Sequence, residues 1–292
     1  MNKRFAIKLA WSFPLFIYAA DVSAWGLFTH IYFAQYVAFS TPLLDPRLRN
    51  AVKRFPLLVM AGACLPDLAL ISKNFKTTHH WDQATLMLTN AKTDEEIAIA
   101  IGYNNHLFVD VVAHNHFVPA FEAKWLNTSI ITHVASEWAM DAFIKQHLIS
   151  RPFDLLKDKA HMDAASRLIS TSFNVSEKKV RKSINHLAWA DKTLRFSGLS
   201  SFLLKFIRHR DDEFIQKLHY YLHQTHDTFT QFEQILSGFM PSIHAELNHL
   251  SATEMSEWRK KCLLDLRLRL TTPLHIFHDH HEHTKSLHNQ LG

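Results

Sequence analysis

The sequence predicts an all-α protein that folds as a single multi-helix domain. The chain has 292 residues, a length above the usual size of one domain but short of two. It contains only 6 Gly and 9 Pro, whereas β-sheet folds use both residues freely at turns. Charged residues make up 20% and hydrophobic residues 47% of the chain. These fractions exclude a disordered, collagen-like or multi-span membrane protein.

Residues 1–24 predict a secretory signal peptide. Three basic residues precede an apolar stretch over residues 9–20, and residues 21–24 (DVSA) provide the small residues of a cleavage site. The apolar stretch is short for a spanning helix, although an uncleaved membrane anchor is the alternative. Cleavage after Ala24 would export the protein to the periplasm or the extracellular space. It would make Trp25 the first residue and lower the formal net charge from +5 to +3.

The mature chain, residues 25–292, is predicted to be helical throughout. Thr93 and Glu96 form a capping box in which each side chain can satisfy a backbone N–H, so a helix is expected from Asp94 to about Ala113. A second box, Ser251 to Glu254, precedes a long C-terminal helix. The other predicted helices cover residues 29–39, 47–60, 128–149, 160–172, 176–190, 196–208 and 212–238. We expect the C-terminal half, residues 150–292, to pack additional helices of unassigned role around the N-terminal half.

Histidine is unusually frequent, with 22 residues, and neutral imidazole is the commonest metal-ligating side chain. His106 and Asp110 lie four residues apart, so they share one helix face and can bind one metal. His116 lies near or just past the predicted helix end and can serve a neighbouring metal. His133 and Glu137 form another His–carboxylate pair at the same spacing on a separate helix.

Four upstream residues complete the candidate set. Asp67 closes the segment GACLPD, His79 opens HHWD, and Trp25 is followed five residues later by His30. Each motif is weak alone. A Trp at the predicted cleavage site, combined with the H-x3-D-x5-H run and the H-x3-E pair, is a specific combination.

These motifs resemble the zinc-dependent phospholipase C family, which shares a superfamily with the fungal zinc single-strand nucleases. The resemblance covers residues 25 to about 140. It implies an all-α fold with three zinc ions between helices, one of them held by the free α-amine and carbonyl of an N-terminal Trp. Carried over residue by residue, the first zinc would take Asp67, His79, His106 and Asp110, the second Trp25, His30 and a shared Asp110, and the third His116, His133 and Glu137.

The resemblance is not uniform along the chain. The five-residue step from Trp25 to His30 resembles the nuclease branch, whereas Glu137 in place of Asp resembles the phospholipase branch. The stretch from residue 113 to residue 117 (AHNHF) resembles a bacterial phospholipase C subgroup. His80 is an alternative to His79, which we prefer because the H-x-x-D spacing from His79 matches the family pattern. We interpret His80 and His114 as supporting or surface residues.

The chemistry of the residues agrees with this assignment. A free α-amine has a pKa of about 8, so zinc can displace its proton at neutral pH, and export followed by cleavage would switch the site on. Two zinc ions sharing Asp110 would hold a bridging water, lower its pKa to about 7 and let the hydroxide attack a phosphodiester in line. The remaining zinc would bind the phosphate oxygens. Asp67 is either a ligand or the general base for this water.

The leading hypothesis is an exported zinc phospholipase C. It would release diacylglycerol and a phosphorylated headgroup from a glycerophospholipid, such as phosphatidylcholine, at a membrane surface. One alternative is a single-strand nuclease or nucleotidase on the same scaffold, which would need nucleic acid as its partner. Another is a non-catalytic protein that only binds zinc.

Three further features of the sequence allow two interpretations each. The His-rich tail, residues 275–283, can recruit metal or remain solvated. The basic runs at residues 178–182, 208–210 and 259–261 either face phosphates or form solvated helix faces. Cys64 and Cys262 pair in one disulfide or stay as buried thiols.

Overall fold

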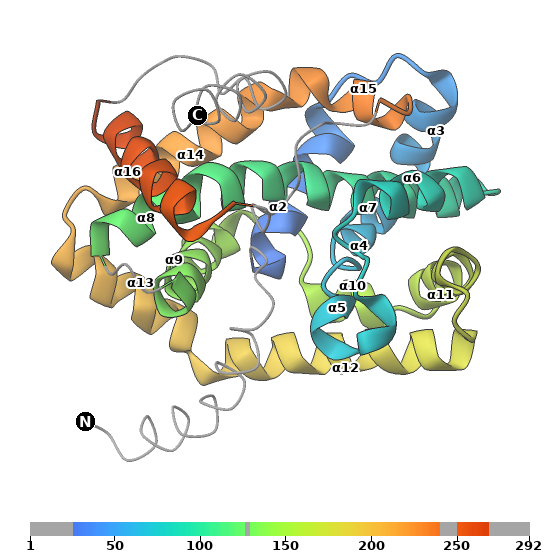
Figure 1. Cartoon of the computed structure of the whole chain (residues 1–292). Coiled ribbons are helices and arrows are strands. Elements are labelled where there is room, and N and C mark those ends of the chain that lie inside the picture. The colour runs from blue at the N-terminus through green and yellow to red at the C-terminus, as the bar shows by residue number, and fades with distance from the viewer. Residues whose placement is uncertain (1–25, 126–128, 240–249, 269–292) are drawn as a thin grey trace.

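The structure, a computed structural model, describes residues 26–125, 129–239 and 250–268, and every element in these ranges is helical (Figure 1). The prediction of an all-α fold is confirmed. The described α-helices are α2 (Leu27–Ser40), α3 (Pro46–Arg54), α4 (Pro56–Gly62), α5 (Leu68–Ile71), α6 (Trp81–Asn90), α7 (Asp94–Val112), α8 (Val118–Trp125), α9 (Ser129–Ile144), α10 (Pro152–Lys157), α11 (Lys159–Phe173), α12 (Glu177–Ser197), α13 (Leu199–Arg210), α14 (Phe214–Thr228), α15 (Phe232–Leu236) and α16 (Ala252–Leu268).

Helix α7 is the centre of the molecule. Every residue from Glu96 to Val112 is buried, and helices from both halves of the chain surround it (Figure 1). A helix that is buried on all sides belongs to the core rather than to an amphipathic surface layer. The polar residues that α7 carries are therefore enclosed by the protein.

Both predicted capping boxes are present. The Glu96 backbone N–H donates to the Thr93 hydroxyl at 3.3 Å, and the Glu96 carboxylate accepts from the Lys92 N–H at 2.9 Å. At α16, the Ser251 N–H donates to the Glu254 carboxylate at 2.8 Å, and the Glu254 N–H donates to the Ser251 hydroxyl at 3.3 Å. These bonds fix where α7 and α16 begin.

Several predicted boundaries are wrong for local reasons. The helix expected over residues 47–60 is two helices, because the fixed φ and missing N–H of Pro56 end α3 and start α4. The segment 212–238 is divided into α14 and α15 by a 3-10 turn over Phe229–Gln231. Helix α12 runs seven residues past the predicted end. The short helices α5, α6, α8 and α10 were not expected.

Helices α4 and α7 pack backbone against backbone at Gly102. A Cβ at this position would lie 1.9 Å from the Val59 carbonyl oxygen, so any larger residue would push the helices apart. The close approach brings the residue after α4, Ala63, against α7. Its carbonyl oxygen lies 2.7 Å from Nδ1 of His106, which connects this packing to the site described below.

Other predictions have mixed outcomes. Within the described ranges no helix combines the length and apolar character that crossing a bilayer requires. Cys64 and Cys262 are both buried free thiols, so the disulfide alternative is wrong. The predicted signal peptide, Trp25 and the His-rich tail lie outside the described residues.

Candidate metal centre

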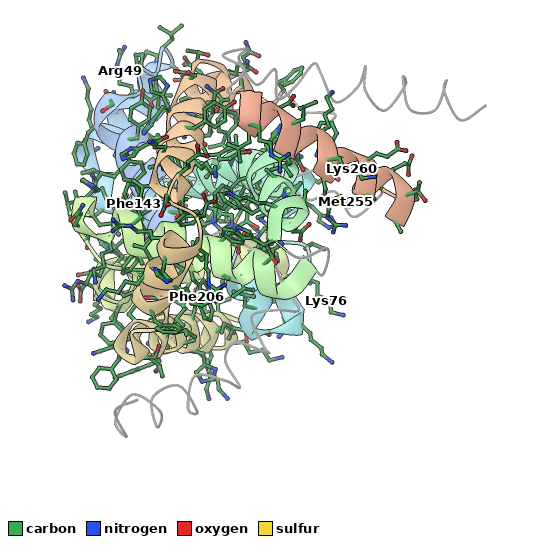
Figure 2. All side chains as sticks on the ribbon, turned by 90° about the vertical axis from the view of Figure 1, so that its left-hand side faces the viewer. Arg49, Lys76, Phe143, Phe206, Met255 and Lys260 are labelled. Carbon is green, nitrogen blue, oxygen red and sulfur yellow. The ribbon has the colours of Figure 1, made fainter. Side chains whose placement is uncertain are left out.

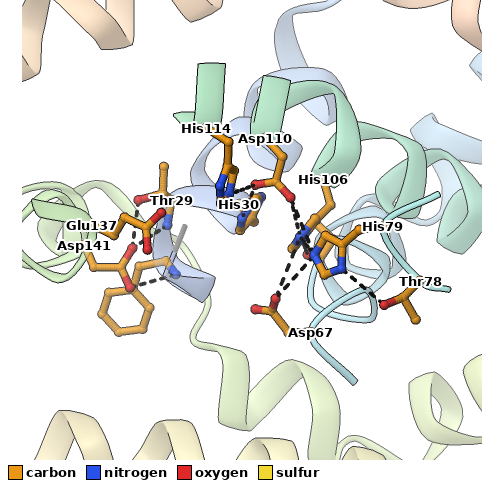
Figure 3. A network of polar contacts seen from close by, with 12 residues as sticks. Thr29, His30, Asp67, Thr78, His79, His106, Asp110, His114, Glu137 and Asp141 are labelled. Carbon is orange, nitrogen blue, oxygen red and sulfur yellow. Dashed lines mark hydrogen bonds and ion pairs between the residues drawn. The ribbon is translucent and has the colours of Figure 1, made fainter. Parts of the chain in front are cut away.

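Five of the predicted ligands meet beside α7 and form what we call the inner group: His30, Asp67, His79, His106 and Asp110 (Figure 3). His106 and Asp110 lie one turn apart on α7, so regular helix geometry places both on one face. His30 comes from α2, Asp67 immediately precedes α5, and His79 lies in the segment before α6. All five belong to the core or border it.

The two carboxylate oxygens of Asp110 face different imidazoles. Oδ1 lies 3.3 Å from Nε2 of His30. Oδ2 lies 3.1 Å from Nε2 of His106 and 3.6 Å from Nε2 of His79. One carboxylate thus separates two sets of nitrogen ligands, as a carboxylate shared by two cations would.

Asp67 lies slightly further out on the His79 side. Its Oδ1 is 3.8 Å from Nε2 of His106 and 4.0 Å from Nε2 of His79. Two overlapping ligand sets result, one of Asp67, His79 and His106 and the other of His30, His106 and Asp110. Within each set, one ligand atom per residue lies within 4.8 Å of the others.

Two of the three histidines of the inner group, His106 and His79, are held by contacts on the side away from the cluster. Because the Ala63 carbonyl can only accept, Nδ1 of His106 must carry a hydrogen, and Nε2 is the nitrogen that faces the carboxylates. Nδ1 of His79 lies 3.3 Å from the Thr78 hydroxyl, which leaves its Nε2 for the cluster. Metal-ligating histidines typically have such a partner on the second nitrogen.

The charges of the inner group suit a divalent cation. Although burial alone would raise it, His106 and His30 hold the pKa of Asp110 well below its usual range. Burial, followed by the neighbouring His106, lowers the pKa of His30, so that ring is neutral. Burial opposes protonation of His106 as well, but Asp110 outweighs it and raises the pKa of His106. A bound cation would take the place of that proton.

A second cluster, which we call the outer group, consists of His114, His133 and Glu137. Nε2 of His133 lies 3.0 Å from Oε1 of Glu137, one turn along α9. The ring centroids of His114 and His133 are 5.1 Å apart. Nε2 of His114 lies 3.6 Å from Oδ1 of Asp110, so the outer group adjoins the inner group.

The structure places His114, and not His116, in this group. The sequence prediction assumed that the helix ends near Ala113, whereas the chain continues as one π-helical turn over Ala113–Phe117. His114, four residues after Asp110, therefore stays on the same face. His116 lies on another side, with its ring 5.7 Å from that of Trp258. The interpretation of His114 as a supporting or surface residue does not fit this geometry either.

Both groups contain buried polar atoms that make no hydrogen bond with the described part of the chain. These atoms are both ring nitrogens of His30, Oδ1 of Asp67, both oxygens of Asp110, Nε2 of His133 and Oε1 of Glu137. Leaving such atoms unsatisfied in a protein interior is costly. Imidazole nitrogens and carboxylate oxygens are the donors that zinc accepts. The residues present therefore fit zinc at both groups.

A family model that describes zinc-dependent phospholipase C matches residues 29–198, more than half of the chain. The chain belongs to the zinc-dependent phospholipase C family. Membership makes the protein a zinc-dependent hydrolase of phosphodiesters, as the sequence predicted. No curated protein and no solved structure matches the chain. The match contains both metal groups of this phospholipase C-type chain and stops well before α16.

The choice between His79 and His80 follows from where the two side chains lie. Nε2 of His79 lies 3.2 Å from Nε2 of His106, inside the inner group. His80 is exposed and occupies the position before the first residue of α6. The geometry of this family member thus favours His79, the residue preferred from the H-x-x-D spacing.

Sequence reasoning missed the residues that hold the start of α2. The carboxylate of Asp141 accepts the Thr29 N–H at 2.9 Å and the Thr29 hydroxyl at 2.7 Å, and it forms an ion pair with Arg195. A Cβ at Gly26 would lie 1.9 Å from Asp141 Oδ2, so any larger residue would displace the Asp141 carboxylate. Asp141 follows Glu137 by one turn of α9, and that stripe of acids on an apolar helix was the available signal.

Proposed function

We propose that this family member is an exported phospholipase C that binds three zinc ions. It would release diacylglycerol and a phosphorylated headgroup from glycerophospholipids, such as phosphatidylcholine, at a membrane surface. The observation that carries this proposal is that the two oxygens of Asp110 face different histidines. Oδ1 lies toward His30, and Oδ2 lies toward His79 and His106. A site for a single cation does not need a carboxylate whose two oxygens face different histidines.

The side chains have distinct tasks in this proposal. When bound, zinc would lower the pKa of a coordinated water and stabilise negative charge on the phosphate oxygens. Asp110 would be the ligand shared by two zinc ions, because its two oxygens face different imidazoles. We assign Asp67 to accept the proton of the attacking water, because its carboxylate lies further from Nε2 of His106 than that of Asp110 does, at 3.8 Å against 3.1 Å.

The outer group supports the binding of phosphate. His114 lies beside Asp110, so the outer group adjoins the inner group. The carboxylate of Glu137 is buried, and a buried carboxylate favours a bound cation. A phosphodiester between the two groups would have positive charge on both sides, which favours the charge that develops on its oxygens during hydrolysis. Metal analysis of the mature protein is expected to find three zinc ions per chain.

Participation of a cleaved N-terminus is part of the proposal. Support comes from Gly26, which packs against Asp141 one turn before His30. One extra residue before Trp25 would move the α-amine away from the inner group. We expect that extension to lower turnover at least about a hundredfold while the thermal unfolding midpoint changes little. Normal turnover by the extended protein would show that the amine is not a ligand.

Helix α13 offers a surface for the membrane. Phe202 and Phe206 are 42% and 49% exposed, and their rings stack with centroids 6.3 Å apart. Lys205 and the run from Arg208 to Arg210 are exposed on the same helix, and Figure 2 shows this side with Phe206 labelled. Aromatic rings flanked by cations suit the interface of a membrane with anionic lipids. Replacing both phenylalanines by serine should slow hydrolysis of vesicles but not of a soluble ester.

The decisive assay compares three substrates with and without a chelator: a chromogenic phosphocholine ester, phosphatidylcholine vesicles and single-stranded DNA. We expect zinc-dependent hydrolysis of the first two. Faster hydrolysis of DNA would favour the nuclease alternative. Tight zinc binding without turnover on any phosphodiester would favour the non-catalytic alternative and refute the proposal.

A further inference from the structure

Helix α16 lies beyond residues 29–198, the part of the chain that matches the family. It packs across α8 and the π-helical turn that carries His114. Figure 2 shows α16 along one side of the molecule, with Met255 and Lys260 labelled. Three hydrogen bonds connect this helix to residues that adjoin the outer group.

The first two contacts hold the π-helical turn. Nε1 of Trp258 donates to the Asn115 carbonyl at 2.6 Å, and Sγ of Cys262 donates to the same oxygen at 3.4 Å. Both side chains are buried. Asn115 directly follows His114, so these bonds fix the backbone beside a ligand in a turn that departs from α-helical hydrogen bonding.

The third contact reaches His133 through a carboxylate. Nε of Arg259 donates to Oε2 of Glu122 at 2.6 Å. The other oxygen of Glu122 lies 3.9 Å from Nδ1 of His133, whose Nε2 faces Glu137. Glu122 is only 2% exposed, and Arg259 is the cation that pairs with it in this buried position.

We propose that α16 is a positioning element of the outer metal group. Arg259 holds the Glu122 carboxylate in place, and Glu122 orients the imidazole of His133 through the nitrogen that does not face Glu137. Trp258 and Cys262 hold the turn that presents His114. The inference rests on the proposed function only in that the outer group binds zinc.

A carboxylate on the second nitrogen of a metal-ligating histidine typically changes metal affinity 10- to 100-fold. Removing Arg259 leaves the buried Glu122 carboxylate without its hydrogen-bond donor, so Glu122 is no longer held beside His133. The inner group, which shares none of these contacts, is unaffected. The zinc site of the outer group should therefore weaken alone.

The test measures zinc stoichiometry and affinity of the full mature chain by competition with a chromophoric chelator. Arg259→Met should weaken one zinc site about 10- to 100-fold and leave the other sites unchanged. Arg259→Lys, which keeps the charge, should recover most of the affinity. The matched control is Arg181→Met, which breaks an Arg–Asp163 ion pair on the solvent-facing side of α11 and α12.

Two further measurements keep the inference falsifiable. Glu122→Gln preserves the volume at the site and should weaken the same zinc site if Arg259→Met does not fold. Unchanged affinities in both variants, with metal-free unfolding midpoints equal to that of wild type, would overturn the positioning role. A wild-type chain that binds only two zinc ions would overturn the outer group itself and, with it, this inference. The zinc stoichiometry of the wild-type chain is measured first, so this outcome is distinguished from a failure of the positioning role.

Discussion

The inner and outer metal groups are built by different means. The inner group gathers residues around α7 in the core, where His30, His106 and Asp110 are fully enclosed. The outer group depends on a π-helical turn for His114 and on α9 for His133, whose side chain is 12% exposed. Its supporting contacts come from α16, more than a hundred residues away along the chain.

The positions of the two groups are therefore determined by different parts of the structure. The position of the inner group follows from helix spacing and from the close packing of α4 against α7, so it is as stable as the core itself. The position of the outer group follows from a local departure from the α-helix and from packing of a late helix. Changes in α16 can therefore adjust the outer group without unfolding the rest of the protein.

The largest expected effect comes from the carboxylate that both groups border. Asp110→Asn keeps the shape of the side chain but removes the negative charge that lies 3.1 Å from Nε2 of His106. We expect turnover of a chromogenic phosphodiester to fall by about a thousandfold or more, because the shared cation sites lose their common ligand. Steady-state kinetics and metal analysis measure the loss.

The control for this variant is Asp163→Asn, which removes an exposed carboxylate from α11. It should retain wild-type turnover and metal content. Activity of Asp110→Asn within a few-fold of wild type would contradict the bridging assignment. Circular dichroism should show the same helix content in both variants.

The pair His114→Ala and His116→Ala tests which histidine completes the outer group. His114→Ala should remove one zinc and lower turnover by about a hundredfold, because it deletes a ligand next to Asp110. His116→Ala should change turnover by less than about threefold, since its ring packs on Trp258 instead. The opposite ranking would restore the assignment made from the sequence.

Regular helix geometry explains how the sequence can place two residues of the inner group side by side. His106 and Asp110 lie at i, i+4 within a helix whose start is marked by a capping box, and any α-helix places them together. Asp67 and His79 lie outside regular helices, so their spacing to α7 gave no geometric information. The resemblance to the family assigned these two candidates to one zinc ion with His106, and the fold places the three residues together.

The outer group shows where sequence reasoning ends. The π-helical turn adds no distinct residue pattern, and it decides between His114 and His116. Glu122 and Arg259 are 137 residues apart, and Asp141 and Arg195 are 54 apart. Such pairs form only through tertiary packing, which spacing along one helix does not encode.

Metal removal should reveal how much each group stabilises the fold. A ligand that binds only the folded state adds about 2.7 kcal/mol per site at a free concentration of a hundred times its Kd. We expect chelation to lower the thermal unfolding midpoint of wild type clearly, and zinc to restore it. Chelation of His114→Ala should lower the midpoint by less, because that variant has already lost the outer zinc. Equal decreases in both proteins would mean that the outer group contributes no stability.

The smallest expected effect is the pH dependence of zinc binding at the inner group. In the metal-free protein, burial raises the pKa of Asp67 from 3.8 to about 7, opposed by His106 and reinforced by Asp110. A cation this close to Asp67 favours the ionised carboxylate, so zinc binding competes with protonation of Asp67 below pH 7. The affinity of the inner group should fall by up to about tenfold between pH 7 and pH 6 on account of this residue.

The stability of the metal-free protein depends on pH in the opposite direction to the zinc affinity, which provides a check. Because the folded protein holds this proton more tightly than the unfolded chain does, its free energy of unfolding decreases as the pH rises from about 4 through 7. Asp67→Asn cannot ionise, so it should bind zinc more weakly at pH 7 and lose both trends. Chelator competition and denaturant unfolding over this range measure the two. If Asp67→Asn keeps the wild-type slope in zinc affinity, another group carries the proton, and Asp67 is ionised throughout.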